Sequence, residues 1–416
     1  MSNQTKLKIG LFGFGVVGES LYHVLQNNIS LNAVIKKICI KHPEKKRNAP
    51  LELFTDQAEH LLNDNDINVI VELIDDADAA YRIVSTALSN RKSVVSANKK
   101  MIAEHQEELL QLQKKNKTSL LYESACCASI PVIRNLEEYY DNDLLQGISG
   151  IVNGSTNYIL TRISEDGVDF NTALKLAQEK GFAESDPVLD IEGIDAVNKL
   201  TILLTHTFGI VTTPASLVYT GITNIHEHDA VFAKEKGYEI KLVAQARKLE
   251  DGTIAAFVLP QFLQKNNQLY NVKNEYNGLI IESGLADKQF FYGKGAGGYP
   301  TASAVLSDLS ALRYNYRYEY KKLYNLQSAP LSSDFYLRVY FSFDKLYNVP
   351  HELFERIEEW TSNEKRCSVI GIIHFSKLLD NDWWKDNNTS IILLPDAFAN
   401  YEQKKKAVLE KELLYL

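Results

Sequence analysis

The chain has 416 residues, which is too long for a single hydrophobic core and fits two or three domains. Its formal net charge of −8 and its short, aromatic-poor basic runs argue against a nucleic-acid partner. No apolar run reaches the ~18 residues of a membrane span, and the first strand pattern begins too early for a secretory signal, so we expect no membrane association. Four cysteines without a CxxC pair favour a reducing compartment without disulfides or zinc, which predicts a cytoplasmic location.

The first part of the chain alternates strand and helix patterns. The strand patterns cover residues 6–15, 32–42, 68–74 and 93–97, and the helical patterns between them cover 16–28 and 79–91. This alternation is typical of α/β proteins with a parallel sheet. We therefore predict that residues 1–130 form a Rossmann domain with a doubly wound sheet.

The middle of the chain has a different texture, with β-rich pieces and less regular alternation. A strand enters a polar turn and a helix over 144–160, and a second helix pattern over 170–182 ends at Gly181. Further β-rich runs follow at 253–262, 277–283 and 289–301. We predict an α+β catalytic and dimerisation domain with a mixed sheet over residues 131–300, followed by a helix, about 301–320, that returns to the first domain.

A linker rich in Ser and Pro, residues 324–334, separates a third unit over residues 330–416. Its predicted elements are a strand (335–341), a helix (351–361), two strands (367–375 and 390–394) and a helix (401–413). We expect a small α+β domain.

A glycine-rich turn joins the first predicted strand to the first helix. Gly13, Gly15 and Gly18 form GxGxxG around Val16 and Val17, a spacing that allows a tight turn, close approach of a pyrophosphate and close packing of helix on strand. A turn with a purely structural purpose is the alternative. Because the strand, turn, helix and strand follow one another here, we favour dinucleotide binding.

The second strand lacks the acid that would hold the ribose hydroxyls of NAD. It runs instead into Lys41, His42, Lys45, Lys46 and Arg47, cations that could accept a 2′-phosphate. A solvated basic loop, compatible with NAD, is the alternative. The missing acid and the several cations favour NADP, with Lys41 and Arg47 as candidate contacts.

An acid-rich segment, 183–200, gathers five carboxylates before a single lysine. Asp195 and Lys199 are four residues apart on one face of a predicted helix, and Glu184, Asp186 and Asp190 precede them. A surface ion pair is the simplest interpretation, and a calcium loop is disfavoured because the spacing does not fit an EF-hand. The functional hypothesis is a polar pocket in which a lysine acts as general acid.

Four ordered segments carry a resemblance to a known family: SANKK (96–100), IVNGSTNYIL (151–160), GFAESDPVLDIEGIDAVNKL (181–200) and GKGAGGYPTASAVLSDL (293–309). With the glycine turn they cover residues 6 to about 320, and they resemble homoserine dehydrogenase. The resemblance implies reversible NAD(P)H-dependent reduction of L-aspartate 4-semialdehyde to L-homoserine, on the route to threonine and methionine. The alternatives are another amino-acid dehydrogenase or a non-catalytic, redox-sensing Rossmann protein.

The resemblance also implies roles for individual residues. Lys199 looks like the proton donor, with Asp195 beside it and Lys99 at the junction of cofactor and substrate. The implied substrate-binding residues are Glu184, Asp190, Asn153, Gly154, Ser155 and Thr156. Asn98, Lys99, Gly295 and Gly297 are implied to approach the cofactor.

Two parts of the chain depart from the family pattern. Many relatives have a glycine-rich turn that binds a monovalent cation such as Na+, whereas this chain has YESACCASIP, which leaves Glu123, Cys126, Ala128 and Ile130 as candidate ligands or as a structural turn. Some relatives end in a regulatory ACT domain with βαββαβ order; residues 335–413 resemble it as far as βαββα but lack the usual glycine. We expect an ACT-like module without effector binding, little inhibition by threonine, and a homodimer or homotetramer.

Overall fold

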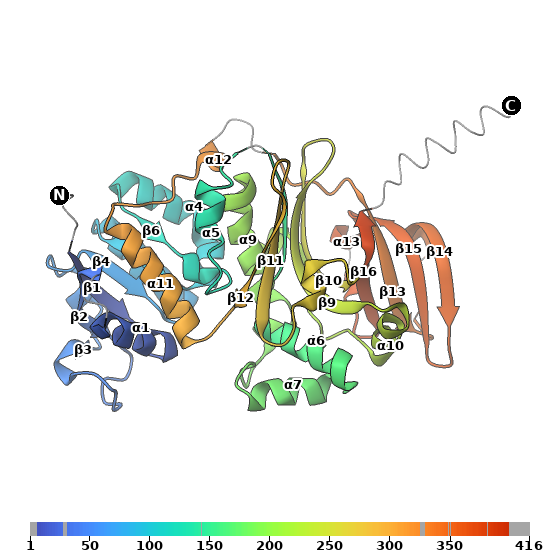
Figure 1. Cartoon of the computed structure of the whole chain (residues 1–416), viewed down its shortest axis with the longest axis horizontal. Helices are drawn as coiled ribbons and strands as arrows, with labels where there is room; N and C mark the ends of the chain where they lie inside the picture. The colour runs from blue at the N-terminus through green and yellow to red at the C-terminus, as the bar shows by residue number, and fades with distance from the viewer. Residues whose placement is uncertain are drawn as a thin grey trace.

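The computed structural model describes residues 6–27, 31–142, 144–324, 329–347, 349, 351–380 and 382–398. Two sheets form the frame of the molecule and lie side by side, the first near the N-terminus and the second, much wider, running to the end of the described chain (Figure 1). Within the described ranges, no helix combines the length and the apolar character needed to cross a membrane.

The first sheet is parallel, and helices cover its faces (Figure 1). Its strands are, in spatial order, β3 (Phe54–Thr55), β2 (Ala33–Cys39), β1 (Leu7–Phe12), β4 (Val69–Glu72), β5 (Ser93–Ser96) and β6 (Leu120–Leu121). The crossover helices include α1 (Val16–Asn27), α3 (Ala77–Ser89) and α4 (Lys99–Asn116), with the single turn α2 at Glu59–Leu62. The strand order reverses between β1 and β4, where doubly wound folds bind their ligands. The predicted Rossmann fold is confirmed.

A helix from far along the chain completes this part of the molecule. α11 (Gly298–Leu312) packs against α1, as Figure 1 shows. The helix ends at Leu312, earlier than the predicted 320. Its first residue must be small, because a Cβ at Gly298 would lie 2.6 Å from the Ser20 hydroxyl of α1.

The second sheet begins with five antiparallel strands. Their spatial order is β12 (Asp287–Lys294), β11 (Tyr276–Ser283), β7 (Leu145–Ile151), β9 (Glu239–Lys248) and β10 (Ile254–Leu263), and the short β8 (Val218–Tyr219) pairs with β10. The helices of this part are α5 (Ile133–Glu138), α6 (Gly154–Asp166), α7 (Phe170–Glu179), α8 (Val188–Ile191), α9 (Ile194–Phe208), α10 (Glu227–Lys236) and α12 (Lys321–Tyr324). Helices α6, α9 and α10 contact β9. The mixed α+β architecture is as predicted.

The C-terminal region differs from the predicted order. It contains β13 (Tyr336–Asp344), β14 (Phe354–Ser362), β15 (Arg366–His374) and β16 (Thr389–Phe398), joined by single turns such as α13 (Lys377–Asp380). The helix predicted at 351–361 is wrong, because those residues form β14, antiparallel to β15. Its three glutamates and Arg356 suit a helix, but pairing at the sheet edge decides their conformation. The predicted helix 401–413 lies outside the described residues.

These last strands continue the second sheet. β16 pairs in parallel with β10 at Gln261 and Leu393, and the spatial order runs on through β13 and β15 to β14. Phe257 and Leu259 of β10 share one buried cluster with Leu337 and Phe341 of β13. The described strands therefore do not show the βαββα order that was expected of an ACT-like unit.

Candidate active site

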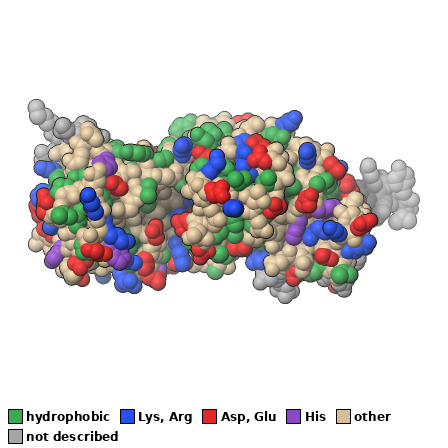
Figure 2. Space-filling model, turned by 90° about the horizontal axis from the view of Figure 1, so that it is seen from below, with side chains coloured by type: hydrophobic (Ala, Val, Ile, Leu, Met, Phe, Trp, Pro, Cys, Tyr) green, Lys and Arg blue, Asp and Glu red, His purple; other side chains and the backbone are tan. Residues whose placement is uncertain are grey.

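A cavity of about 590 Å³ lies where the carboxyl ends of β4 and β5 face the second domain. Seen from below, the surface is hollowed between the first lobe and the middle of the molecule, and charged side chains of both signs are interspersed around it (Figure 2). The predicted site residues that line the cavity are Val17, Lys99, Asn153, Gly154, Ser155, Glu184, Asp190, Asp195, Lys199, Gly295 and Gly297. The fold thus brings together, at one cavity, residues as far apart in the sequence as Val17 and Gly297.

Asp195 joins two lysines at the cavity wall. Its Oδ2 lies 2.7 Å from Lys199 Nζ, and its Oδ1 lies 2.8 Å from Lys99 Nζ. Lys199 Nζ also donates to the Val152 carbonyl at 2.6 Å. The surface ion pair considered from the sequence is wrong, since residues 195–207 of α9 are all buried. A helix that is apolar on most of its faces belongs inside the protein.

The three charges determine the protonation of the cluster. Burial alone would raise the pKa of Asp195, but the Lys199 and Lys99 ammonium groups outweigh burial and hold that pKa well below its usual range. Conversely, the Asp195 charge raises the pKa of Lys99. One carboxylate therefore supports two ammonium groups, and the cluster retains a cationic face toward the cavity.

Asn153 connects this cluster to the acid-rich turn. As the N-cap of α6, its Oδ1 accepts the Thr156 N–H at 2.8 Å. Its Nδ2 donates to Asp190 at 2.7 Å and to Asp195 at 2.8 Å. Thr156 itself does not line the cavity, and its hydroxyl donates to the Asn153 carbonyl at 3.2 Å. The amide thus fixes two carboxylates with one side chain.

Several lining residues were missed from the sequence. They include Asp75, Ser124, Lys180, Glu275, Lys294 and Thr301. Lys294 and Thr301 both belong to the segment 293–309 that carries part of the family resemblance, so membership of that motif is an available signal. Asp75 and Glu275 stand in no motif, and the fold alone brings them to the cavity.

The glycine turn has the shape that a dinucleotide requires. Gly13 has φ +93°, and a Cβ there would lie 2.5 Å from the Leu73 carbonyl. A Cβ at Gly18 would lie 2.4 Å from the Gly13 carbonyl, whereas one at Gly15 would meet nothing within 4 Å. The open space at Gly15, beside the exposed Val16 and the start of α1, fits a pyrophosphate.

Three other predicted cofactor residues, Asn98, Arg47 and Lys41, have different surroundings. Asn98 caps α4 and donates to the Ile74 carbonyl at 3.0 Å, so it orders the loops around the cavity without lining it. Arg47 lines a second cavity of about 560 Å³, next to Phe14 of the glycine turn and to Lys45 and Lys46. Lys41 is outside both cavities, with its ammonium 3.7 Å from Asp76.

The candidate cation turn is tightly bonded to the protein. The two Glu123 carboxylate oxygens accept the N–H groups of Ile133 and Arg134, at 2.8 and 2.9 Å. Cys127 and Ala128 have φ of +58° and +40°, so the chain keeps here a left-handed turn that glycine would favour. The described residues contain no cluster of three or more His, Cys, Asp or Glu side chains suited to a metal.

Comparisons with known proteins agree with this geometry. Residues 131–310 match the model of the family described as homoserine dehydrogenase, and residues 13–123 match its NAD-binding domain. A homoserine dehydrogenase of Bacillus subtilis is 35% identical over 321 residues, covering 75% of this chain and 74% of that protein. One of Helicobacter pylori is 36% identical over 311 residues, covering 73% of each.

Solved structures give the same result. A homoserine dehydrogenase from Thiobacillus denitrificans superposes with a TM-score of 0.80 at 25% identity, covering 93% of this chain and 98% of that one. A hyperthermophilic archaeal homoserine dehydrogenase in complex with NADPH has a TM-score of 0.65 at 27% identity, covering 76% of this chain and 99% of that one.

Proposed function

The chain belongs to the homoserine dehydrogenase family, and from that premise we propose how its own residues reduce L-aspartate 4-semialdehyde to L-homoserine. The nicotinamide cofactor, when bound, supplies the hydride that reaches the aldehyde carbon. The carbonyl oxygen then needs a proton and, while charge develops on it, a cation nearby. The observation that carries the proposal is Asp195, held between Lys99 and Lys199 at the cavity wall.

Lys199 is the proton donor in this proposal. Its ammonium lies at the cavity and is aimed by the Asp195 carboxylate and the Val152 carbonyl, so one N–H can turn to the substrate oxygen. Asp195 orients Lys199 and holds Lys99 at the junction of the two domains. Lys99 adds positive charge where the alkoxide forms.

The acid-rich turn binds the amino-acid end of the substrate in this proposal. Glu184 and Asp190 line the cavity and contact the substrate ammonium, with Asn153, Gly154 and Ser155 at the start of α6 completing the wall. Asn153 holds Asp190 in place, and Thr156 supports Asn153 from behind. The roles follow from charge, since an ammonium group entering a cavity needs carboxylates around it.

NADP is the proposed cofactor. Its proposed contacts are Gly13, Gly15, Val16, Val17 and Gly18 of the glycine turn, together with Gly295 and Gly297, which line the cavity. Arg47 is the proposed contact of the 2′-phosphate and Lys41 an outer cation, which the cavity beside Arg47 supports. Arg47→Ala should raise KM for NADPH about tenfold and leave KM for NADH unchanged, because a phosphate contact is lost. Equal changes for the two cofactors would count against the assignment.

The remaining proposals concern organisation. We divide the chain into a nucleotide-binding unit (1–130, with α11), a catalytic and dimerisation unit (131–300) and a C-terminal module (330–416), assembled as a homodimer or homotetramer in the cytoplasm. Four free cysteines, three of them buried, suit a reducing compartment. Na+ bound by carbonyl oxygens of Cys126, Ala128 and Ile130 is proposed on the left-handed turn at Cys127 and Ala128.

The direct test is NADPH oxidation, followed by absorbance, with L-aspartate 4-semialdehyde as substrate. Turnover that produces homoserine is expected, and its absence would overturn the proposed function. Repeating the assay with NADH compares the cofactors. Exchange of Na+ for a bulky organic cation tests the cation site, since a lower rate is expected only if the metal is bound.

A further inference from the structure

The segment between the single turn at Gln268–Asn271 and β11 brings another carboxylate to the cavity. Glu275 lines the cavity together with Glu184, Asp190 and Asp195. Asp195 is neutralised by two lysines and Asp190 accepts a bond from Asn153. Glu275 has no hydrogen-bond or ion-pair partner among the residues that the structure describes. Glu275 is therefore a half-buried residue of the cavity wall whose charge no described residue neutralises, which leaves it for a cation that enters the cavity.

We propose that Glu275 is a further substrate-binding residue, which contacts the ammonium group of the amino-acid substrate, and that Asn157 and Lys241 are positioning residues for the segment that carries it. The inference rests on the proposed function, because an amino-acid substrate is what brings an ammonium group into this cavity. It adds to the acid-rich turn a carboxylate from a different part of the sequence.

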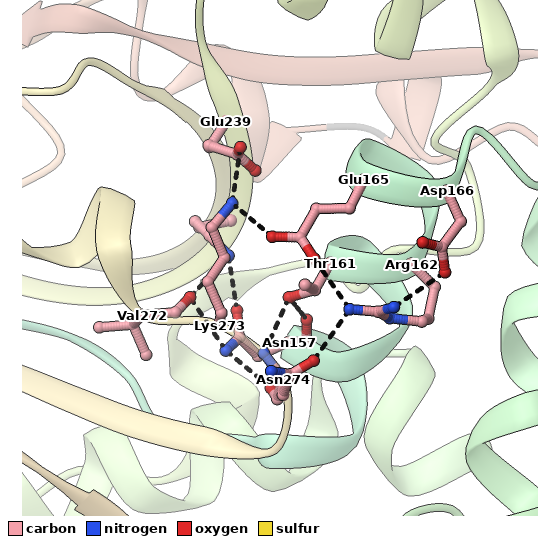
Figure 3. Close-up of polar contacts among 10 residues, drawn as sticks. Asn157, Thr161, Arg162, Glu165, Asp166, Glu239, Val272, Lys273 and Asn274 are labelled. Carbon is pink, nitrogen blue, oxygen red and sulfur yellow. Dashed lines mark hydrogen bonds and ion pairs between the residues drawn. The ribbon is translucent and has the colours of Figure 1, made fainter.

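Asn157 of α6 holds the backbone of this segment directly. Its Nδ2 lies 3.2, 2.9 and 3.1 Å from the carbonyl oxygens of Val272, Asn274 and Tyr276. These three carbonyls converge on one amide group that is almost completely buried, as Figure 3 shows for Val272 and Asn274. An amide has two N–H groups, so the three contacts share them and fix the curvature of the segment on both sides of Glu275.

Lys241 of β9 fixes Asn157 in turn. Its ammonium, inaccessible to solvent, donates to Asn157 Oδ1 at 3.0 Å and to the Val272 carbonyl at 2.7 Å. Because Oδ1 is bonded to a cation, the amide cannot flip, and Nδ2 must face the carbonyls. A buried amino group without these acceptors would be strongly unfavourable, so the arrangement is well determined.

A second set of contacts from α6 fixes the tip of the segment (Figure 3). Asn274 has the left-handed φ of +56°, its N–H donates to the Thr161 hydroxyl at 3.1 Å, and its side-chain oxygen accepts from Arg162 at 3.0 Å. Thr161 also bonds to the Asn157 carbonyl at 2.6 Å. Side chains of α6 therefore hold alternate residues of the segment, Val272, Asn274 and Tyr276.

The same helix begins at the active site. Its N-cap, Asn153, bonds Asp190 and Asp195, and a Cβ at Gly154 would lie 2.5 Å from the Glu275 carbonyl. The start of α6 and the backbone of Glu275 are thus in direct contact. Positioning the segment along α6 places the Glu275 carboxylate relative to the residues that hold the reacting end of the substrate.

The first test is Glu275→Gln, which keeps the shape and removes the charge. KM for homoserine should rise about tenfold, with kcat and KM for NADP little changed, because an interaction with a charged group is lost in both ground and transition states. Glu282→Gln, at the half-buried end of β11, outside the cavity and paired with Lys288 at 2.8 Å, is the matched control and should keep the parent KM. A parent-like KM in Glu275→Gln would overturn the binding role.

The second test is Asn157→Asp, alone and combined with Glu275→Gln. Aspartate keeps an oxygen for Lys241 but loses the three donations to the segment, so KM for homoserine should rise about tenfold. In the Glu275→Gln background this rise should disappear, because the carboxylate being positioned is absent. A rise of equal size in both backgrounds would mean a general structural role and overturn the positioning claim.

Calorimetric titration with homoserine separates this inference from the proposed function. A parent that turns over aspartate semialdehyde supports the function whatever the variants do. Weaker homoserine binding by Glu275→Gln, about tenfold against the parent, is then expected. Unchanged binding by Glu275→Gln in an active parent would overturn the inference alone.

Discussion

Two buried lysines of the second domain differ in the partners of their ammonium groups. Lys199 Nζ contacts the Asp195 carboxylate at 2.7 Å and the Val152 carbonyl at 2.6 Å. Lys241 Nζ contacts the Val272 carbonyl at 2.7 Å and the Asn157 amide oxygen at 3.0 Å, both neutral. Burial lowers the pKa of Lys241 to about 7, although Glu239 nearby opposes the shift. The carboxylate partner of Lys199 suits the proposed proton delivery. The neutral acceptors of Lys241 suit the positioning of a backbone segment.

Lys199→Ala should have the largest effect, because it removes the proposed general acid. We expect kcat for aspartate semialdehyde to fall about a hundredfold to ten-thousandfold. Asp195 keeps Lys99 at 2.8 Å, so the variant should still fold. NADPH absorbance at saturating substrate measures the loss, with Lys288→Ala on exposed β12 as control. Full activity in Lys199→Ala would remove the functional contrast between the two lysines.

Asp195→Asn should come next and should act on stability as well as rate. The substitution leaves Lys199 buried without its carboxylate, which should lower the free energy of unfolding by about 3 kcal/mol. Urea unfolding followed by circular dichroism measures this difference. Asp166→Asn breaks the exposed pair with Arg162 and should cost less than about 1 kcal/mol. Equal losses in the two variants would show that burial of the pair does not matter.

Lys241→Met should change how stability depends on pH. The folded pKa of Lys241 is about 7, and an unfolded lysine has a pKa of about 10.4. Between these values the unfolded chain binds one more proton at this site, so the free energy of unfolding should rise with pH by up to about 1.4 kcal/mol per unit. Below about pH 7 this contribution is constant, because both states are protonated.

The measurement for Lys241 is a difference between two proteins. Unfolding of the parent and of Lys241→Met at several values from about pH 7.5 to about pH 9 cancels the other titrating groups. The parent should gain stability relative to the variant across this range. A difference that is independent of pH would mean that Lys241 is charged like an ordinary lysine and would erase the contrast with the active-site cluster.

Lys273→Met should have the smallest effect. Lys273, which is partly exposed, pairs with the buried Glu239 at 2.7 Å, as Figure 3 shows, and its charge helps to lower the pKa of Lys241. Glu239 keeps the nearby charge of Lys241, so the variant should lose only about 1 kcal/mol of stability. The pH at which the Lys241 contribution begins should move upward, since a like charge is gone. If that pH does not change, burial alone lowers the pKa of Lys241.

Sequence patterns predicted most of the fold where local signals and tertiary structure agree. The glycine turn, the alternating elements of residues 6–97 and the Asp195–Lys199 spacing all pointed to the structure that is present. The prediction for β14 was wrong because its glutamates and Arg356 favour a helix in isolation. Its pairing with β15 depends on contacts that the segment itself does not encode.

The site was predictable as far as its motifs extend. Lys99 reaches Asp195 across the domain junction, and only the resemblance to a family suggested that meeting. Lys241 lies in a strand where residues 239–244 are all buried, so alternation of polar and apolar residues gave no indication of its surroundings. Glu275 stands outside every motif, and its place in the cavity follows from the hydrogen bonds between α6 and the segment that carries it.

The pairing of β16 with β10 affects how the second sheet can fold while the chain is being synthesised. β10 leaves the ribosome with β9 along one side. On its other side the short β8 pairs only with Phe257 and Val258, and the stretch around Gln261 has to wait for β16, the last strand in the described chain. During that interval the nascent protein carries a partly open strand edge close to the apolar side chains of Phe257 and Leu259. A chain interrupted before β16 keeps that edge, so release of truncated products should lead to aggregation rather than to a smaller enzyme.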